Sequence, residues 1–255
     1  MSVPGLAIIT GGSTGIGAAL ARQLHHRGWK IGLIARRTEP LQALADELGD
    51  GVAWRAVDVC DAEGLQVACG ELQDELGPCE LLLANAGVGA PTSIQRFDPA
   101  AVTGVMRVNF EGVVNAVAAV LPGMLERGRG QLAATSSYAG WRGMPTTAAY
   151  SASKAAVSSF MESLRVALRG RGVAVTTLHP GYVRTDLTAG NRFWMPFVMD
   201  LEPFAARTVR GLLARKSEVN VPWPMTIVVG TLRRLPNWLY DWAMGMMSPK
   251  PRARR

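Results

Sequence analysis

A tyrosine and a lysine four positions apart form the pair of residues best suited to chemistry. Tyr150 and Lys154 enclose the stretch Ser-Ala-Ser. In a helix, residues at this separation project from one face. An ammonium close to a phenol favours the phenolate and lowers a pKa that starts near about 10. A tyrosine of this kind gives or takes a proton near neutral pH. Taken alone, the spacing is common on helix surfaces, so its meaning depends on the rest of the chain.

A glycine-rich turn supplies the second chemical signal. Residues 10–17 read Thr-Gly-Gly-Ser-Thr-Gly-Ile-Gly, between an expected strand at 6–10 and an expected helix near 15–27. Glycines allow a sharp turn and a close approach of the backbone to a pyrophosphate, whose charge is favoured at a helix N-terminus. The alternative is an ordinary glycine-rich turn without a ligand.

The end of the next expected strand, at 30–35, indicates which dinucleotide would bind. An NAD-binding chain places an acidic residue about 20 residues beyond the glycines, where it bonds the ribose 2′-hydroxyl. Here the strand is followed by Arg36 and Arg37. Two guanidinium groups suit a 2′-phosphate in charge and geometry. The sequence favours NADP(H) over NAD(H), with a solvated arginine pair as the alternative.

The elements that must position these residues alternate along the chain. Further β-rich runs are expected at 52–57, 80–84, 131–136, 173–178 and 219–221, and helical patterns near 40–48, 62–76, 99–126, 150–169 and 203–216. Parallel neighbours need helical crossovers, so this alternation predicts a parallel sheet. We expect one α/β domain over residues 1–221, a doubly wound, Rossmann-type three-layer sandwich around a mostly parallel seven-stranded sheet.

Composition excludes several other classes of protein. The 255 residues are 48% hydrophobic and 18% charged, which is not typical of disorder. The three cysteines fit no zinc pattern and are expected to be reduced, and the three histidines lack metal-ligand spacing. No signal peptide is expected at the N-terminus, and the 14-residue charge-free apolar stretch at 219–232 is too short to span a bilayer. We therefore expect a cytoplasmic protein.

The positive charge is concentrated at one end of the chain. The net charge is +7, but residues 1–206 carry a net charge of −1 and residues 207–255 carry +8. A nearly neutral main body with a basic, aromatic tail is not the pattern of a surface that follows a nucleic-acid duplex. No nucleic-acid partner is expected.

The order of these motifs resembles that of the short-chain dehydrogenase/reductase family. The resemblance covers about residues 6–221. It rests on the glycine-rich turn, Val57-Asp58-Val59, Asn85-Ala86-Gly87, Asn109, the pair Ser136-Ser137, Tyr150 with Lys154, and the run 180–185. It implies hydride transfer between a nicotinamide and a carbonyl or alcohol group. The alternative functions are a non-catalytic nucleotide-sensing module and a membrane-associated module on the same fold.

The resemblance implies four catalytic residues. Ser137 would bond the substrate oxygen, while strand alternation directs Ser136 elsewhere. Tyr150 would be the general acid or base. Lys154 would hold the nicotinamide ribose and depress the tyrosine pKa, and Asn109 would anchor a water that passes protons toward Lys154.

A larger set of residues is implied to bind the cofactor. Asp58 would face the adenine, and the residues from 180 onward would border the nicotinamide. The set comprises Gly11, Ser13, Thr14, Gly15, Ile16, Gly17, Arg36, Arg37, Asp58, Val59, Asn85, Ala86, Gly87, Tyr150, Lys154, Pro180, Gly181, Val183 and Thr185.

Two segments concern the substrate and partners. An apolar segment at about 186–205, with Phe193, Trp194 and Phe197, lies where the family places its substrate lid, which favours a lipophilic substrate. Residues 222–255 form an apolar, basic extension that the family's fatty-acid-synthesis reductases lack. Its two expected amphipathic pieces cover the pocket or a subunit interface, rest on a membrane surface, or form a frayed tail. A homodimer or homotetramer is expected.

Overall fold

Seven parallel strands form the centre of the protein in the computed structural model, which describes residues 4–189 and 195–247. Their order across the sheet is β3-β2-β1-β4-β5-β6-β7. Every strand pairs in parallel with its neighbours. The strands are β1 Leu6–Thr10, β2 Lys30–Ala35, β3 Val52–Ala56, β4 Cys79–Ala84, β5 Gly130–Thr135, β6 Val173–Pro180 and β7 Glu218–Val221. The predicted fold class is confirmed, and the sheet is parallel throughout.

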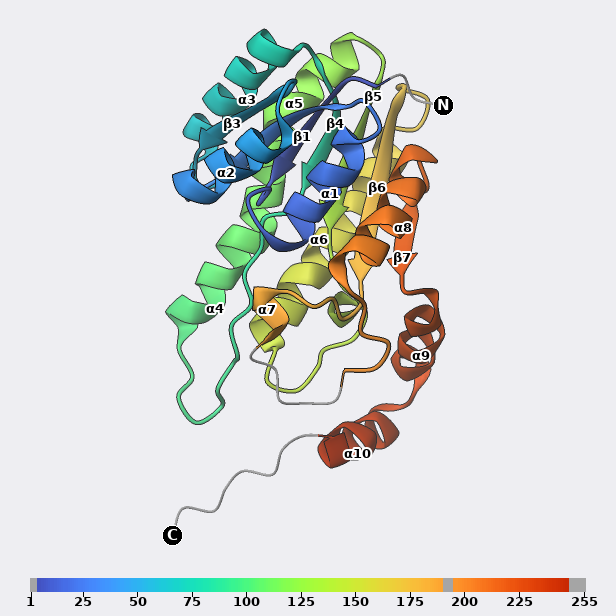
Figure 1. Cartoon of the computed structure of the whole chain (residues 1–255). Coiled ribbons are helices and arrows are strands. Elements are labelled where there is room, and N and C mark those ends of the chain that lie inside the picture. Colours follow the sequence, from blue (N-terminus) through green and yellow to red (C-terminus); the bar gives the residue numbers. More distant parts are fainter. Residues whose placement is uncertain (1–3, 190–194, 248–255) are drawn as a thin grey trace.

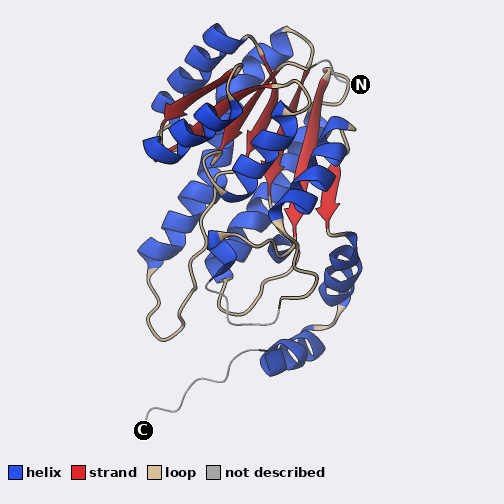
Figure 2. Cartoon of the chain, in the orientation of Figure 1, coloured by secondary structure: helices blue, strands red, loops and turns tan. Residues whose placement is uncertain are grey.

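Helices cover both faces of this sheet (Figures 1 and 2). One core cluster joins one face of the sheet to α1, α2 and α8, and a second joins the other face to α3, α5 and α6. The helices are α1 Gly15–His25, α2 Thr38–Leu48, α3 Ala62–Leu76, α4 Pro99–Met106, α5 Gly112–Glu126, α6 Ala148–Ala167, α7 Asp186–Ala189, α8 Leu201–Leu213, α9 Trp223–Arg234 and α10 Asn237–Met247.

The central strands have almost no exposed residues, because helices cover both faces of the sheet. All five residues of β1 and all six of β5 are buried. A strand buried on both faces reads as a continuous apolar run rather than as an alternating one. The sequence prediction located each strand by such runs, to within two residues at either end.

The predicted helix at 99–126 is continuous but contains a local change of winding. Between α4 and α5, residues Arg107–Glu111 form a π-helical turn. By length and composition the whole stretch Pro99–Glu126 could cross a membrane, a candidate that the sequence prediction did not consider. Its residues Val113, Val117 and Val120 are buried in the core cluster with α3 and β4. We therefore assign it as a core helix.

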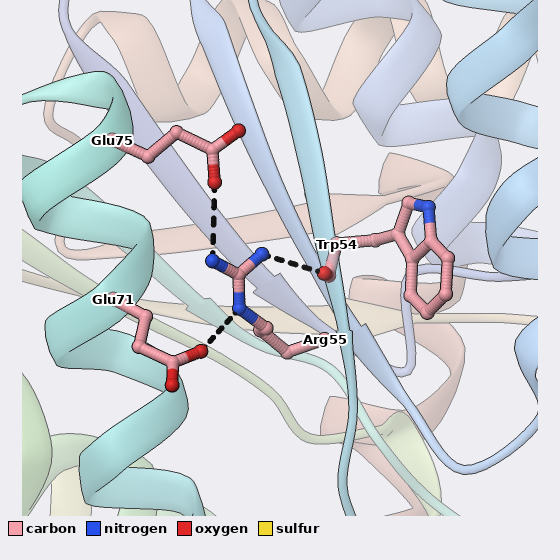
Figure 3. A network of polar contacts seen from close by, with 4 residues as sticks. All are labelled: Trp54, Arg55, Glu71 and Glu75. Atoms are coloured by element: carbon pink, nitrogen blue, oxygen red, sulfur yellow. Dashed lines mark hydrogen bonds and ion pairs between the residues drawn. The ribbon is translucent and has the colours of Figure 1, made fainter.

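An ion-pair network fastens the edge strand β3 to α3 (Figure 3). Arg55 Nε donates to Glu71, its Nη2 donates to Glu75 Oε2 at 3.1 Å, and its Nη1 donates to the Trp54 carbonyl at 2.9 Å. Hydrogen bonds to both carboxylates raise the pKa of Arg55. The network holds together the edge of the sheet that lies farthest from β7.

The C-terminal extension forms α9 and α10, which lie beyond β7 at the end toward which the strands point (Figure 1). Met225 of α9 and Tyr240 and Met244 of α10 are buried. They belong to the sides of the helices that face the rest of the molecule. The described part of the extension, residues 222–247, therefore packs on the domain.

The three cysteines, which lie elsewhere in the chain, are free thiols.

Candidate active site

The candidate site is a cavity of about 330 Å³ at the carboxyl ends of the central strands. On one side of β1 lie β2 and then β3. The chain then crosses over to β4, which lies on the other side of β1, so the direction in which strands are added reverses. Such a reversal leaves a crevice between the two halves of a doubly wound sheet, which is where ligands of these folds bind. The cavity is lined from the turn after β1 to the turn after β6.

The glycine-rich turn after β1 forms one wall of the cavity and needs glycine for two different reasons. Gly11 has a φ of 62°, and a Cβ there would lie 2.7 Å from Ala86 Cα. A Cβ on Gly17 would lie 2.2 Å from the Gly11 carbonyl oxygen. Gly11 therefore allows the turn to approach β4, while Gly17 allows α1 to close on the turn. Unlike the other predicted glycines, Gly17 does not line the cavity.

The start of α1 is suited to an anion. Thr14 precedes the helix in an extended conformation, and its side chain makes no capping hydrogen bond to the described residues. No acidic residue lies in the first turn of this fully described helix. The backbone N–H groups and the helix dipole favour a phosphate at such a position. This cradle fits the pyrophosphate of a dinucleotide.

Charged side chains border the far end of the cavity beside β2 and β3. Arg36, Arg37 and Asp58 line it. Arg36 Nη1 lies 3.8 Å from Asp58 Oδ2, and Asp58 Oδ1 accepts a hydrogen bond from the Cys60 amide at 2.9 Å. Arg37 makes no ion pair with any residue that the structure describes. At least one guanidinium is therefore free to meet a phosphate.

Two adjacent serines at the end of β5 have different surroundings. Both serines line the cavity, but the Ser137 hydroxyl accepts from the Ala139 amide at 3.1 Å and lies near enough to Tyr150 to lower the pKa of that side chain. The hydroxyl of Ser136 instead bonds the Lys154 carbonyl oxygen and the Ser158 hydroxyl, each at 2.7 Å. Ser136 thus ties β5 to α6. Contact of Ser137, rather than Ser136, with a substrate oxygen stays a prediction.

Tyr150 sits in the first turn of α6 beside Ser137, and its environment corrects one expectation. Burial raises the pKa of Tyr150, and the Ser137 hydrogen bond only partly opposes this. The expected lowering by Lys154 is not seen. The Lys154 Nζ lies 5.7 Å from the centre of the Tyr150 ring rather than against its oxygen. A phenol that keeps its proton suits a general acid.

Lys154 is the most deeply buried charged group of the site, only 3% exposed. Its Nζ donates a hydrogen bond to the Thr135 carbonyl oxygen at 2.7 Å. Burial lowers its pKa from 10.5 to about 8. Such a group remains mostly protonated at neutral pH and can donate to a bound hydroxyl. A Cβ on Gly87 would lie 3.4 Å from Nζ, so the glycine leaves space for the ammonium.

Asn109 lies in the π-helical turn, and its carboxamide is occupied by the protein. Its Oδ1 accepts from the Val88 amide at 2.8 Å, while its Nδ2 donates to the Val88 carbonyl oxygen at 3.0 Å and to Ser153 Oγ at 2.9 Å. Asn109 is completely buried and does not line the cavity. Its side chain fixes the segment after β4 against α6. The water relay through Asn109 stays a prediction.

The structure brings almost all of the predicted site residues into one cavity. Its lining includes all of the predicted catalytic and cofactor-binding residues except Gly17 and Asn109. Asn85 lines the cavity but also bonds Gly11 and Thr135, so it holds three strand ends together. Phe193 and Trp194 of the predicted lid lie outside the described residues, and Phe197 is exposed. Of the lid, Asp186 and Thr188 line the cavity.

Sequence reasoning missed an aromatic cluster behind Ser137. Trp141 Nε1 donates to His179 Nδ1 at 3.1 Å, and buried His179 also bonds the Ser137 backbone. Burial lowers the pKa of His179, which keeps the ring neutral. The pKa of Tyr182 is raised, first by burial and second by the nearby Tyr150. These contacts join residues far apart in sequence, so no local motif indicates them.

A second missed feature links the C-terminal extension to the segment between Ser137 and Tyr150. Arg142 Nη1 donates to the carbonyl oxygens of Leu232 and, at 2.7 Å, Leu235, and its guanidinium lies 3.8 Å from the centre of the Tyr240 ring. The Tyr240 hydroxyl donates to the Gly143 carbonyl oxygen at 2.6 Å. Nearby, the Tyr138 hydroxyl bonds Thr226 Oγ1 at 2.7 Å. Residues 222–240 of the extension thus support the segment 138–143 from the outside.

The fold and the site together define an oxidoreductase built on a dinucleotide-binding sheet. Residues 5–195 match the family model described as short chain dehydrogenase. The chain belongs to the short-chain dehydrogenase/reductase family, whose members act on carbonyl or alcohol groups with NAD(P).

Relatives and solved structures agree with this assignment. An uncharacterized oxidoreductase of Myxococcus xanthus is 43% identical over 240 residues, covering 93% of this chain and 95% of that protein. A putative short-chain dehydrogenase structure from Novosphingobium aromaticivorans has a TM-score of 0.80 at 25% identity, covering 98% of this chain and 89% of the other. A variant of actinorhodin polyketide ketoreductase, solved with NADPH, has a TM-score of 0.78 at 25% identity, with 87% and 97% covered.

Proposed function

We propose that the protein uses NADPH to reduce a lipophilic ketone or aldehyde to an alcohol. The observation that carries this proposal is that Ser137 and Tyr150 line the same cavity, together with Lys154 one helical turn farther along α6. The bound cofactor would supply hydride, and the residues would supply orientation and a proton. A nucleotide-sensing module would need no such proton donor.

The residues have separate tasks in this reaction. Ser137 donates a hydrogen bond to the substrate oxygen and stabilises the negative charge that develops there. Tyr150, whose pKa is raised, keeps its proton until that oxygen needs it. Lys154 donates from a buried position and orients the ribose of the cofactor. Because its raised pKa leaves Tyr150 protonated at neutral pH, the residue can deliver a proton to the substrate oxygen when the reaction runs as carbonyl reduction.

The preference for NADPH is supported by charge. Arg36 and Arg37 line the end of the cavity where a 2′-phosphate would lie, and Arg37 has no acidic partner among the described residues. The ketoreductase of similar fold was solved with NADPH. The lipophilic class of substrate is supported by the apolar composition of the predicted lid at about 186–205, while the described lid residues that line the cavity itself are Asp186 and Thr188.

One experiment tests the reaction and its mechanism. NADPH oxidation is followed at about 340 nm against a panel of ketones and aldehydes, with Tyr150→Phe assayed in parallel. Removal of a general acid lowers kcat by about 10²–10⁴-fold, and Ser137→Ala should show a comparable loss. NADPH binding, measured by its fluorescence, should survive both changes. Unchanged turnover in Tyr150→Phe would refute the proposed mechanism.

A second experiment tests the cofactor preference. Arg36→Ala combined with Arg37→Ala should raise KM for NADPH by roughly ten- to a hundredfold, because charge-assisted hydrogen bonds to the phosphate are lost. KM for NADH should hardly change. Arg169→Ala with Arg171→Ala is a matched control, because these two exposed arginines lie between α6 and β6, away from the cavity. Equal losses for both cofactors would contradict the assignment.

A further inference from the structure

The exposed apolar side chains of this protein are concentrated at one end. Twelve large hydrophobic residues are exposed among those that the structure describes, and nine of them come from three segments. These are the β4–α4 connection, the 195–200 segment and the two C-terminal helices. All three lie at the end of the molecule toward which the strands point (Figure 1). The active-site cavity is lined by residues at the carboxyl ends of the strands, which is the same end.

The two C-terminal helices each carry a second apolar face. In α10, Trp238 and Trp242 are 72% and 62% exposed, whereas Tyr240 is buried against the domain. With about 100° between successive helical residues, the two tryptophans lie about 160° from Tyr240 on either side. In α9, Trp223 and Ile227 have the same relation to buried Met225. The buried faces hold the extension in place, and the opposite faces remain uncovered.

The charge around these faces complements an anionic surface. Arg233 and Arg234, both exposed, end α9, and Arg234 falls on the Trp223 face at a separation of 11 residues. Within the described residues 222–247, Arg233 and Arg234 are the only Lys or Arg and Asp241 is the only acidic residue. Tryptophans beside arginines are typical of helices that rest in the headgroup region of a bilayer. A second copy of the chain would instead place this positive segment against its own like charge.

We propose that α9 and α10 dock the protein on an anionic lipid bilayer, with the exposed tryptophans inserted at the headgroup level. The proposal concerns binding and does not depend on turnover. Its geometry directs the cavity mouth toward the membrane. If the proposed function also holds, a lipophilic substrate can reach Tyr150 from the bilayer without crossing water.

Flotation with vesicles tests the docking surface. The full chain is mixed with vesicles of phosphatidylcholine alone or with about 30% phosphatidylglycerol and separated on a sucrose gradient. Wild-type protein should float with the anionic vesicles, and salt at about 0.5 M should release it because screening weakens headgroup attraction. Tryptophan emission should shift to shorter wavelength in the same samples. Wild-type protein that remains at the bottom with anionic vesicles would overturn the proposal.

Two variants and one control locate the surface. Trp238→Ser with Trp242→Ser should lower vesicle binding by about tenfold or more. Arg233→Gln with Arg234→Gln should remove most of the dependence on anionic lipid. Val67→Ser with Val166→Ser, exposed apolar residues of α3 and α6, should bind as the wild type does. NADPH oxidation and thermal unfolding should be unchanged in all three.

Light scattering on the same proteins separates a membrane from a second copy. A tryptophan variant that binds vesicles like the wild type overturns the proposal. The proposal is also overturned if the wild-type protein does not bind vesicles but self-associates in light scattering, and if the tryptophan variant loses this self-association. A failure of carbonyl reduction would instead concern the proposed function alone.

Discussion

Replacement of Lys154 by methionine should reveal how much its burial costs the folded protein. The ammonium is 3% exposed and has a pKa of about 8 instead of 10.5. Each pKa unit corresponds to about 1.4 kcal/mol, so the lowered pKa means that the buried charge costs about 3 kcal/mol. Below pH 8 the lysine is charged in both the folded and the unfolded chain, and the whole cost is present. Between pH 8 and 10.5 the unfolded chain binds more protons, so stability rises with pH.

The assay is denaturant unfolding from about pH 7 to about pH 9.5. Over this range the wild-type protein should gain about 2 kcal/mol of unfolding free energy relative to Lys154→Met. Lys216→Met is the matched control because Lys216 is exposed, and its curve should run parallel to that of the wild type. At pH 7, Lys154→Met should also be at least as stable as the wild type, although inactive. Parallel curves for wild type and Lys154→Met would show that the site does not perturb this lysine.

Three further results are expected. The value of kcat/KM for carbonyl reduction should fall above about pH 8 as Lys154 loses its proton, while Tyr150, with its raised pKa, stays protonated; a descending limb near pH 10 would contradict this assignment. Arg142→Met should lower the unfolding free energy by about 2 kcal/mol and reduce kcat, because it frees the loop beside Ser137; unchanged kcat in a destabilised variant would leave the contact with a purely structural role. Arg55→Met should cost only about 1 kcal/mol in chemical unfolding, because both carboxylates of its network are half exposed and water screens the pairs; unchanged NADPH oxidation is expected.

The parts of the fold predicted from sequence are those fixed by local pattern. The buried runs of β1 and β5 and the glycine turn depend on neighbouring residues, and the structure places them as expected. The π-helical turn around Asn109 was missed because an apolar helix pattern does not distinguish it from α-helix. Its side-chain partners Val88 and Ser153 lie 21 and 44 residues away and are equally invisible in a motif.

The sequence predicted which residues line the site better than it predicted their pKa shifts. The motifs identified the residues that line the cavity, including Ser137 and Tyr150. They gave the wrong direction for the pKa of Tyr150, because burial outweighs the lowering by Ser137 and cannot be read from spacing. The contact of Arg142 with Tyr240, 98 residues apart, likewise appears only in the fold. Oligomeric state stays a prediction.

The contacts of residues 138–143 with α9 and α10 have a consequence for chimeras between this protein and its relatives. The family match ends at residue 195, yet Tyr138 and Arg142 depend on partners at positions 222–240. A chimera that takes its C-terminus from a relative would leave Arg142 without its carbonyl partners unless residues 138–143 were exchanged as well. Residues 138–143 and 222–240 therefore have to be exchanged together, and substitutions in one segment are expected to be accompanied by substitutions in the other.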